Sequence, residues 1–446
     1  MSGFKNKILQ ARYYEREIEK LGIKLSIKNK LHFTEDGDTA FSSIIFNKRK
    51  VAKAIIKDIK NMRYLFNPAY EYHLEINNKK REFYKFKIID RIVHGVIAKI
   101  ISEEAKDFIP EQLFSYLEGK SAHNAINQLA KYVRQYKKDN KNTPKRGLYV
   151  LRQDIEDYTD SIPVHEKAPL WGKLSAILHL KTKEKTFDKY LWALVKSTIR
   201  PEIHYAGMRY SKLKGIPTGS PISTVLYNIC GLDVDRICRS INGAFYARYS
   251  DDFIFMHPDP DLVVKVHENI QATLNSQGLS SNKNKSKVIY LNAAGRPSQE
   301  WQDALGCADI SFLGARVSSN GTISLSKNKT RNFLRSLRER IRRCNKSFAK
   351  YSTSEALFAV CAIINNCIFN ESSKVINEKS ASFILRKTTD RSFLKQVDYL
   401  IQLMIAEEIS GVRGVRAFRI IAPDKLRNKY GLRSIFHVRN LFGKAA

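Results

Sequence analysis

The sequence predicts an α+β fold, with antiparallel β-hairpins among helices and a basic, helical C-terminal region. Three observations predict it. Residues 245–257 are two apolar, aromatic-rich runs joined at Ser-Asp-Asp, a pattern typical of a hairpin with the acidic pair at its tight turn. A further apolar strand, residues 148–154, ends in Asp154. From residue 327 onward, apolar residues recur at helical spacing among many basic ones.

Local periodicity and turn chemistry then place each element in order. Polar residues 77–79 (NNK) predict the turn of an earlier hairpin within residues 70–90. A loop rich in Lys and Asn, residues 137–146, leads into the Asp154 strand, and a change from strands to helices marks a boundary near 326. Helices are predicted at 8–30, 47–66, 90–106, 121–138, 164–200, 221–241 and 260–277, an extended segment at 203–209, and strands near 287–291 and 311–317.

Composition indicates a folded protein that binds a polyanion. The chain has 446 residues, enough for two or three subdomains, and its net charge is +33, from 77 basic and 44 acidic residues. No run of 18 apolar residues predicts a membrane span, and the N-terminus lacks the apolar core of a secretory signal. The six cysteines form no CxxC pair and have no partnered histidine, so a zinc site is not expected. Scattered thiols fit a reducing cytoplasm.

The acidic residues at two strand ends predict a cation site. Asp251 and Asp252 are adjacent, and neighbouring carboxylates repel each other unless a cation neutralises them. Taken alone, the pair is more simply interpreted as a solvated turn. The upstream strand ending in Asp154 changes that interpretation, because a strand ending in Asp followed by an Asp-Asp hairpin is the layout of a two-metal nucleotidyl-transfer palm.

Several blocks in the same order resemble the bacterial reverse transcriptases, the group that includes group II intron, retron and phage-defence enzymes. The resemblance runs from about residue 77 to 316, and the agreement of several blocks is more specific than any one of them. The blocks are Lys80-Arg81 with Asp90-Arg91, residues 114–126 (FSYLEGKSAHNAI), Asp154-Ile155, residues 215–223 (GIPTGSPIS) with Asn228 and Leu232-Asp233, residues 248–252 (RYSDD), Gly278-Leu279 with Asn282 and Lys285-Ser286, and residues 312–314 (FLG).

The resemblance implies a right-hand polymerase fold. It places an N-terminal region and fingers at 1–146, a palm with interspersed fingers elements at 147–326, and a basic helical thumb with a C-terminal RNA-binding region at 327–446. It also implies two Mg²⁺ ions, for which Mn²⁺ can substitute. Asp154 and Asp251 would bridge them, Asp252 would support them, and the Ile155 carbonyl would add a ligand.

Other residues take substrate roles through the same resemblance. Arg81 would clamp the triphosphate with help from Lys80, although a solvated basic turn is the alternative. Lys285 would protonate the departing pyrophosphate, or belong to a solvated face. Gly219 and Ser220 would let the backbone approach the nucleotide, or simply begin a helix. Nucleic acid would contact Arg248, Phe312, Leu313, Gly314, Arg331, Arg335, Arg338, Arg413, Arg416 and Arg419, although the last three also fit a solvated basic tail.

Two positions depart from the family pattern. The aromatic residue that excludes ribonucleotides, five positions after the first metal-binding Asp, is here Thr159, while Tyr158 lies one place earlier. Either Tyr158 takes that nucleotide-binding role or sugar discrimination is weak, which predicts measurable ribonucleotide incorporation. Thr218 replaces the Gln of the usual PQG, which affects template handling rather than the metals.

The sequence therefore predicts an RNA-directed DNA polymerase that copies a structured noncoding RNA into cDNA from dNTPs. Compactness and the absence of a recognisable nuclease region most resemble the defence-associated reverse transcriptases of unknown group, in the cytoplasm and without a membrane partner. The alternatives are a template-independent polymerase of the abortive-infection type, a retron or group II intron enzyme, and a non-catalytic RNA-binding scaffold. The template, the primer and the oligomeric state are left open.

Overall fold

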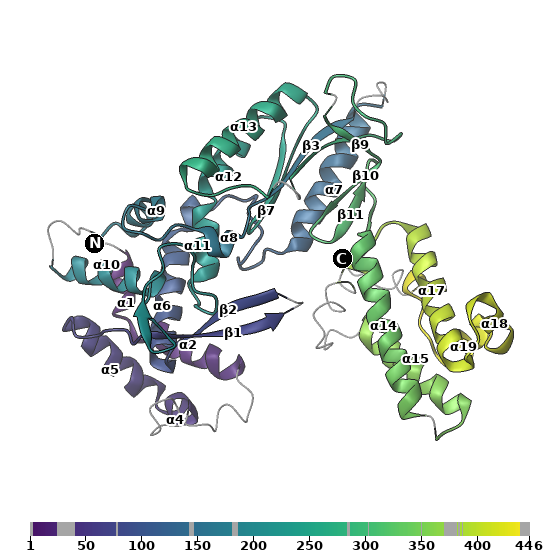
Figure 1. Ribbon diagram of the computed structural model, residues 1–446, viewed down its shortest axis with the longest axis horizontal. Coiled ribbons are helices and arrows are strands. Elements are labelled where there is room, and N and C mark those ends of the chain that lie inside the picture. Colours follow the sequence, from purple (N-terminus) through teal and green to yellow (C-terminus); the bar gives the residue numbers. More distant parts are fainter. Residues whose placement is uncertain are drawn as a thin grey trace. The chain divides into compact units, whose positions relative to one another are not determined.

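The computed structural model describes residues 3–24, 41–76, 79–141, 147–180, 186–282, 286–301, 303–348, 350–369, 381, 384–385 and 387–437. Strands and helices are mixed up to residue 325, and the described residues beyond it form helices and turns (Figure 1). The predicted α+β fold is confirmed. The short strands β9 and β12 were not predicted, because three-residue strands are too short to show a period.

The helices are α1 (Gly3–Ile8), α2 (Ala11–Lys24), α4 (Phe41–Phe46), α5 (Lys48–Lys60), α6 (Ile88–Glu104), η1 (Lys106–Phe108), α7 (Ala122–Asp139), α8 (Tyr158–Ser161), α9 (Pro169–Leu178), α10 (Thr186–Ile199), α11 (Ser223–Cys230), α12 (Leu232–Arg239), α13 (Pro260–Ser276), α14 (Lys327–Ser347), α15 (Thr353–Phe369), α17 (Arg391–Ser410), η2 (Gly414–Arg416), α18 (Ala417–Ile420) and α19 (Pro423–Asn428). The strands are β1 (Ala69–Ile76), β2 (Lys79–Lys85), β3 (Leu148–Asp154), β4 (Ile203–Tyr205), β5 (Met208–Tyr210), β6 (Phe245–Tyr249), β7 (Asp252–His257), β8 (Lys287–Leu291), β9 (Leu305–Cys307), β10 (Asp309–Phe312), β11 (Ala315–Ser318) and β12 (Ile323–Leu325).

The chain divides into two compact units. The first comprises Met1–Ser121, Leu151–Phe255 and Asp261–Lys287, and the second comprises Ala122–Val150, Met256–Pro260 and Val288–Ala446. A five-stranded sheet has the order β6-β7-β3-β8-β9. No described helix combines the length and the apolar character needed to cross a membrane.

A four-stranded sheet in the first unit carries the earlier predicted hairpin. Its strand order is β2-β1-β4-β5, with β1 antiparallel to β2 and parallel to β4. Buried Ala69, Tyr84, Phe86 and Ile203 form a core cluster at this sheet. The Asn77-Asn78 turn lies outside the described residues, but β1 and β2 pair up to Ile76 and Lys79 on either side of it.

Helix α6 is apolar on nearly every side because α1, α2 and α9 pack against it. A histidine lies in this core: His94 is 1% exposed, between the rings of Phe66 (4.6 Å) and Phe86 (4.8 Å). Among the described residues, neither of its ring nitrogens has a hydrogen-bond partner. Burial lowers the pKa of His94 to about 3, so the folded protein holds a neutral imidazole.

We expect His94 to make the fold acid-sensitive. In the unfolded chain its pKa is about 6.5, so the unfolded state binds the extra proton first as pH falls. Its contribution to stability is complete above about pH 6.5 and decreases toward pH 3, by about 2 kcal/mol at pH 5. Urea unfolding at pH 7.5 and pH 5 measures this. His94→Phe should lose less stability on acidification than the wild type, whereas the exposed-site control His437→Phe should lose as much.

In the second unit, α14 packs its apolar face against α15 and α17 (Figure 1). Phe333, Leu337, Ile341 and Cys344 are buried at three- and four-residue spacing along α14. On the same helix, Arg338 pairs with Glu407 at 2.7 Å and Arg342 with Glu408 at 2.9 Å, both on α17. The basic helix predicted from residue 327 therefore uses part of its charge to hold a neighbouring helix.

Candidate active site

The first component is the end of strand β3. Buried residues Leu148–Leu151 anchor β3, and the half-buried Asp154 ends it. The Asp154 carbonyl accepts a hydrogen bond from the Asn282 amide at 2.8 Å, and the Ile155 amide donates to the Asp251 carbonyl at 3.3 Å. The strand end and the Asp-Asp hairpin are thus joined through their backbones, as the sequence predicted.

The second component is the hairpin of β6 and β7. Ser250 adopts a left-handed backbone conformation (φ 61°) between the strands, and Asp251 follows it. The sequence placed both acids at the turn; Asp252 is instead the first residue of β7, because Ser250 and Asp251 suffice to close the hairpin. The aromatic residues of this hairpin, Phe245, Tyr246, Phe253 and Phe255, are buried as predicted.

The three carboxylates interact electrostatically. Burial raises the pKa of Asp252 to about 6, and the charges of Asp154 and Asp251 add to this rise, while Arg152 opposes it. Arg152 Nη2 lies 3.5 Å from Asp252 Oδ2, and the buried Asp252 Oδ1 has no hydrogen-bond partner among the described residues. Clustered carboxylates with an unsatisfied buried oxygen fit a divalent cation with oxygen ligands.

A buried ion pair between Arg248 of β6 and Asp235 of α12 holds the β6–β7 hairpin. Arg248 donates to both oxygens of Asp235 on α12, at 2.8 and 2.6 Å, and Tyr246 donates to the same carboxylate at 2.7 Å. Arg248 also donates to the carbonyls of Ser250 (3.2 Å) and Asn228 (3.0 Å). The prediction that Arg248 binds nucleic acid is therefore wrong, because its side chain is fully buried and satisfied by protein groups. Although burial disfavours its charge, Asp235 raises the pKa of Arg248 above the ordinary value.

A second network fixes the turn itself. Ser115 Oγ accepts from the Ser250 amide at 2.9 Å and donates to Asn228 Oδ1 at 2.8 Å, and Asn228 returns a bond to the Ser115 carbonyl at 2.9 Å. The Phe114 amide also donates to the Arg248 carbonyl at 2.9 Å. Ser115 and Asn228 belong to blocks that resemble the family, but the resemblance implies no role for their side chains, and Asp235 lies outside those blocks. Nothing in the local sequence indicates that these distant polar residues meet.

The glycine-rich loop 215–220 lies between two backbone segments of the first unit. The Ile216 amide donates to the Thr159 carbonyl at 2.9 Å, and the Tyr84 amide of β2 donates to the Thr218 carbonyl at 3.2 Å. Gly219 has φ 108°, and a Cβ there would lie 3.0 Å from the Tyr84 carbonyl oxygen. Ser220 is buried, and its hydroxyl has no partner among the described residues. Gly219 is exposed, as a backbone that approaches a nucleotide would need to be.

Tyr158 does not act as the sugar-discriminating residue. It is 3% exposed, and its hydroxyl donates to the Tyr227 carbonyl at 2.7 Å. The alternative that Tyr158 takes the nucleotide-binding role is therefore wrong, because its ring is held inside the protein. Thr159 is half-buried, and it remains the residue predicted to face the sugar of the incoming nucleotide.

We expect the wild-type protein to incorporate ribonucleotides measurably, since Thr159 is small. Thr159→Phe should improve selection for dNTPs, because a larger ring would meet the 2′-hydroxyl. Primer extension with each nucleotide type measures the ratio. Tyr158→Phe, which removes only the internal hydroxyl, should leave this ratio unchanged. Strict dNTP selectivity in the wild type would contradict the prediction.

The predicted triphosphate ligands are only partly described. Arg81 is exposed on β2, opposite Leu74 of β1. Lys80 lies on the same strand, but its side chain is outside the described residues, as is Lys285. Asp90, quoted in the same block as Arg81, is buried and accepts hydrogen bonds from Tyr64 (2.7 Å) and Asn67 (3.0 Å), so it holds the chain before β1.

The second unit holds the remaining predicted nucleic-acid contacts. Leu313 and Gly314 form the β10–β11 turn with positive φ angles of 50° and 82°, and both are partly exposed. Phe312 is fully buried, so the prediction that its side chain contacts nucleic acid is wrong. Arg338 forms an ion pair with Glu407 of α17. The exposed members of the predicted set are Arg331, Arg335, Arg413, Arg416 and Arg419.

Comparisons with known proteins give a family match and more distant structural similarities. The profile of the reverse transcriptase (RNA-dependent DNA polymerase) family matches residues 76–334. Telomerase from Candida albicans, in complex with a TWJ fragment of telomeric RNA, is structurally similar with a TM-score of 0.46 and 12% identity, covering 89% of this chain and 68% of that one. Apo telomerase from Candida tropicalis, truncated from its C-terminal domain, is similar with a TM-score of 0.42 and 12% identity, covering 64% and 67%. A search of curated proteins finds no match.

Proposed function

Since the chain belongs to the reverse transcriptase family and is an RNA-directed DNA polymerase, we propose that Asp154, Asp251 and Asp252 catalyse its nucleotidyl transfer with two divalent cations. Membership also confirms the right-hand polymerase fold that the sequence predicted. The observation that carries the proposal is that the Asp154 strand end and the Asp251-Asp252 hairpin are joined by the hydrogen bond from the Ile155 amide to the Asp251 carbonyl. Burial, together with the charges of Asp154 and Asp251, raises the pKa of Asp252 there.

Asp154 and Asp251 would hold the cations, with Asp252 and the Ile155 carbonyl as supporting ligands. Mg²⁺ suits this all-oxygen donor set, and Mn²⁺ can replace it. Two ions held there would supply charge that lowers the pKa of an attacking 3′-hydroxyl and stabilises a leaving pyrophosphate. The protein itself fixes the positions of the acids. The Ile155–Asp251 backbone bond fixes the spacing of the two acids, and the Ser115 and Arg248 networks fix the turn that presents Asp251.

Other residues would bind the incoming nucleotide. Arg81, exposed on β2, would bind the triphosphate with Lys80, and Lys285 would protonate the pyrophosphate. Thr159 would face the sugar. Gly219 would admit the nucleotide closely because it has no side chain, and Ser220 would contribute the hydroxyl that lacks a partner among the described residues.

We propose a structured noncoding RNA as the template, copied to cDNA in the cytoplasm as part of bacterial anti-phage defence. The net charge of +33 and the exposed Arg331, Arg335, Arg413, Arg416 and Arg419 support binding of RNA phosphates. Leu313 and Gly314 would contact the primer strand. The defence role is supported by the resemblance to the defence-associated enzymes described above.

The test is to purify the protein with its co-expressed RNA, sequence that RNA, and add dNTPs with Mg²⁺. The expected product is DNA complementary to one enriched RNA, absent in the Asp251→Ala/Asp252→Ala variant, which should keep its RNA. DNA without a matching template would establish untemplated synthesis instead. RNA binding without any DNA product would contradict the catalytic proposal. Loss of anti-phage protection in the same variant tests the defence role.

A further inference from the structure

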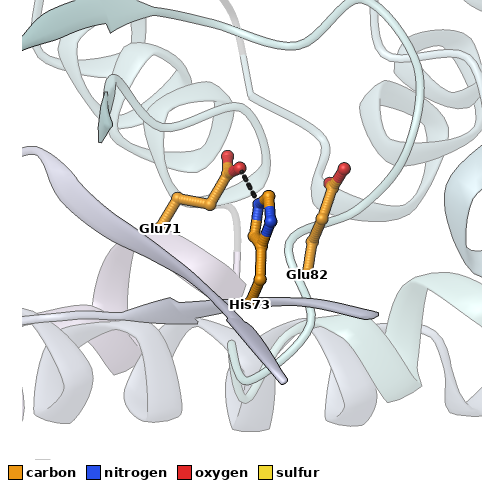
Figure 2. Close-up of side chains that lie close together, drawn as sticks. All are labelled: Glu71, His73 and Glu82. Atoms are coloured by element: carbon orange, nitrogen blue, oxygen red, sulfur yellow. Dashed lines mark hydrogen bonds and ion pairs between the residues drawn. The ribbon is translucent and has the colours of Figure 1, made fainter. Parts of the chain in front are cut away.

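A second group of metal-ligating side chains lies on the hairpin of β1 and β2, within the first unit. Glu71 and His73 alternate along β1, and Glu82 of β2 is the register partner of His73. Residues two apart on one strand, and residues opposite each other on paired strands, share one face of a sheet. Figure 2 shows the imidazole of His73 between the two carboxylates. One ligand atom from each side chain lies within 4.8 Å of the others.

Both carboxylates accept a hydrogen bond from a tyrosine outside the group. His73 Nε2 lies 2.7 Å from Glu71 Oε1 (Figure 2), and the Tyr210 hydroxyl donates to the other oxygen of Glu71. The Tyr84 hydroxyl donates to Glu82 Oε2 at 2.8 Å. The Glu71 side chain is only 5% exposed, so its carboxylate is aimed into the group from inside the protein. Metal-binding carboxylates are commonly oriented by such outer hydrogen bonds.

We propose that Glu71, His73 and Glu82 bind a divalent cation of the Zn²⁺ type, separate from the ions at Asp154 and Asp251. One imidazole nitrogen and two carboxylates are a donor set that Zn²⁺ accepts in tetrahedral geometry, with water as a fourth ligand. Mg²⁺ prefers oxygen ligands and keeps its waters, so the nitrogen selects against it. Binding requires some side-chain movement, because tetrahedral metal–ligand bonds of about 2.0–2.2 Å separate the donor atoms by roughly 3.3–3.6 Å. The hydrogen bond between His73 Nε2 and Glu71 Oε1, at 2.7 Å, would therefore open to admit the ion.

A side-chain cation already occupies the open side of the group. The Lys212 ammonium pairs with Glu82, whose side chain is 47% exposed. A divalent ion would replace the single positive charge of the Lys212 ammonium with a charge of +2. Lys212 would then be released to solvent. Lys212 is therefore the competitor of the metal, and its removal should strengthen metal binding. A mere internal ion pair would not behave in this way.

The site would cross-link two strands next to a proposed substrate ligand. Glu82 follows Arg81 directly on β2, and the Tyr84 amide holds the nucleotide loop at Thr218. A metal joining β1 to β2 here would stiffen the strand that presents Arg81. Cysteine spacing carries no signal for this site, whose sequence pattern is a Glu-x-His alternation completed across a hairpin.

Equilibrium binding of Zn²⁺ to the full-length protein, in millimolar Mg²⁺, tests the proposal without any catalytic turnover. We expect one Zn²⁺ per chain, with at least about 100-fold weaker binding in His73→Asn and in Glu82→Gln. Lys212→Ala should bind Zn²⁺ more tightly. Hydrogen exchange of β1 and β2 should slow when Zn²⁺ is added to the wild type but not to His73→Asn.

Two controls separate this site from others. Glu75→Gln removes an exposed carboxylate on the same face of β1 and should leave binding unchanged. Asp251→Ala/Asp252→Ala should also retain the ion, so failure of the proposed catalytic site would not be confused with failure of this one. Zn²⁺ held equally by His73→Asn would be an adventitious ion only, and either that result or no binding at micromolar Zn²⁺ would overturn the proposal.

Discussion

Asp251→Asn should slow DNA synthesis on the order of 10³-fold or more, because the substitution removes a charge from the position that the two cations would share. The amide has nearly the same shape as the carboxylate, so the Ile155–Asp251 backbone bond and the hairpin are kept. Single-nucleotide primer extension on an RNA template at saturating dNTP measures the effect. The loss should be in the rate of the chemical step, with RNA affinity unchanged.

The matched control is Asp259→Asn, which neutralises an exposed acid just beyond β7. It should retain near wild-type activity, so a general effect of lost negative charge can be excluded. Activity within about tenfold of wild type in Asp251→Asn would contradict the assignment of Asp251 as a metal ligand.

Arg248→Met should destabilise the protein by about 3–5 kcal/mol, since it leaves the buried Asp235 carboxylate without its ion-pair partner. Arg248 and Asp235 side chains are only 1% and 2% exposed, so water cannot replace the lost contacts. Its guanidinium also packs so closely on Gly231 that a Cβ there would lie 2.5 Å from it. Urea unfolding measures the loss.

A second substitution distinguishes lost charge pairing from lost packing. Arg248→Met/Asp235→Asn removes the unpaired charge, so it should recover part of the stability that Arg248→Met loses. Arg236→Met, which alters an exposed arginine of α12, should cost less than about 1 kcal/mol. A double variant no more stable than Arg248→Met would show that Asp235 is not the source of the cost.

The sequence predicted most elements because their periods are strong. The alternation in residues 245–257 and the apolar face of α14 each produce the structure that they predict. The joining of Asp154 to the hairpin was also predictable, since both acids belong to ordered family blocks. That prediction still rests on resemblance, because nothing in the spacing of residues 154 and 251 shows that they meet.

What the sequence could not predict depends on which way a side chain points and on what lies opposite it. Arg248 and Tyr158 belong to blocks associated with substrates, yet both side chains turn into the protein, toward Asp235 and Tyr227. A charged or aromatic residue beside a catalytic acid has the same sequence pattern whether it faces inward or outward. The Glu71–His73–Glu82 group depends on strand register, which a single strand does not specify.

The Ser115 network also constrains how the chain reaches its working form. Ser115 is separated by 113 residues from Asn228 and by 135 from Ser250, so the turn before Asp251 depends on long-range pairing. Contacts between such distant segments form late, after a large loss of chain entropy. A nascent or truncated chain that ends before residue 250 lacks this turn entirely. The turn that presents Asp251 therefore forms only when residues from Ser115 to Ser250 are all present in the chain.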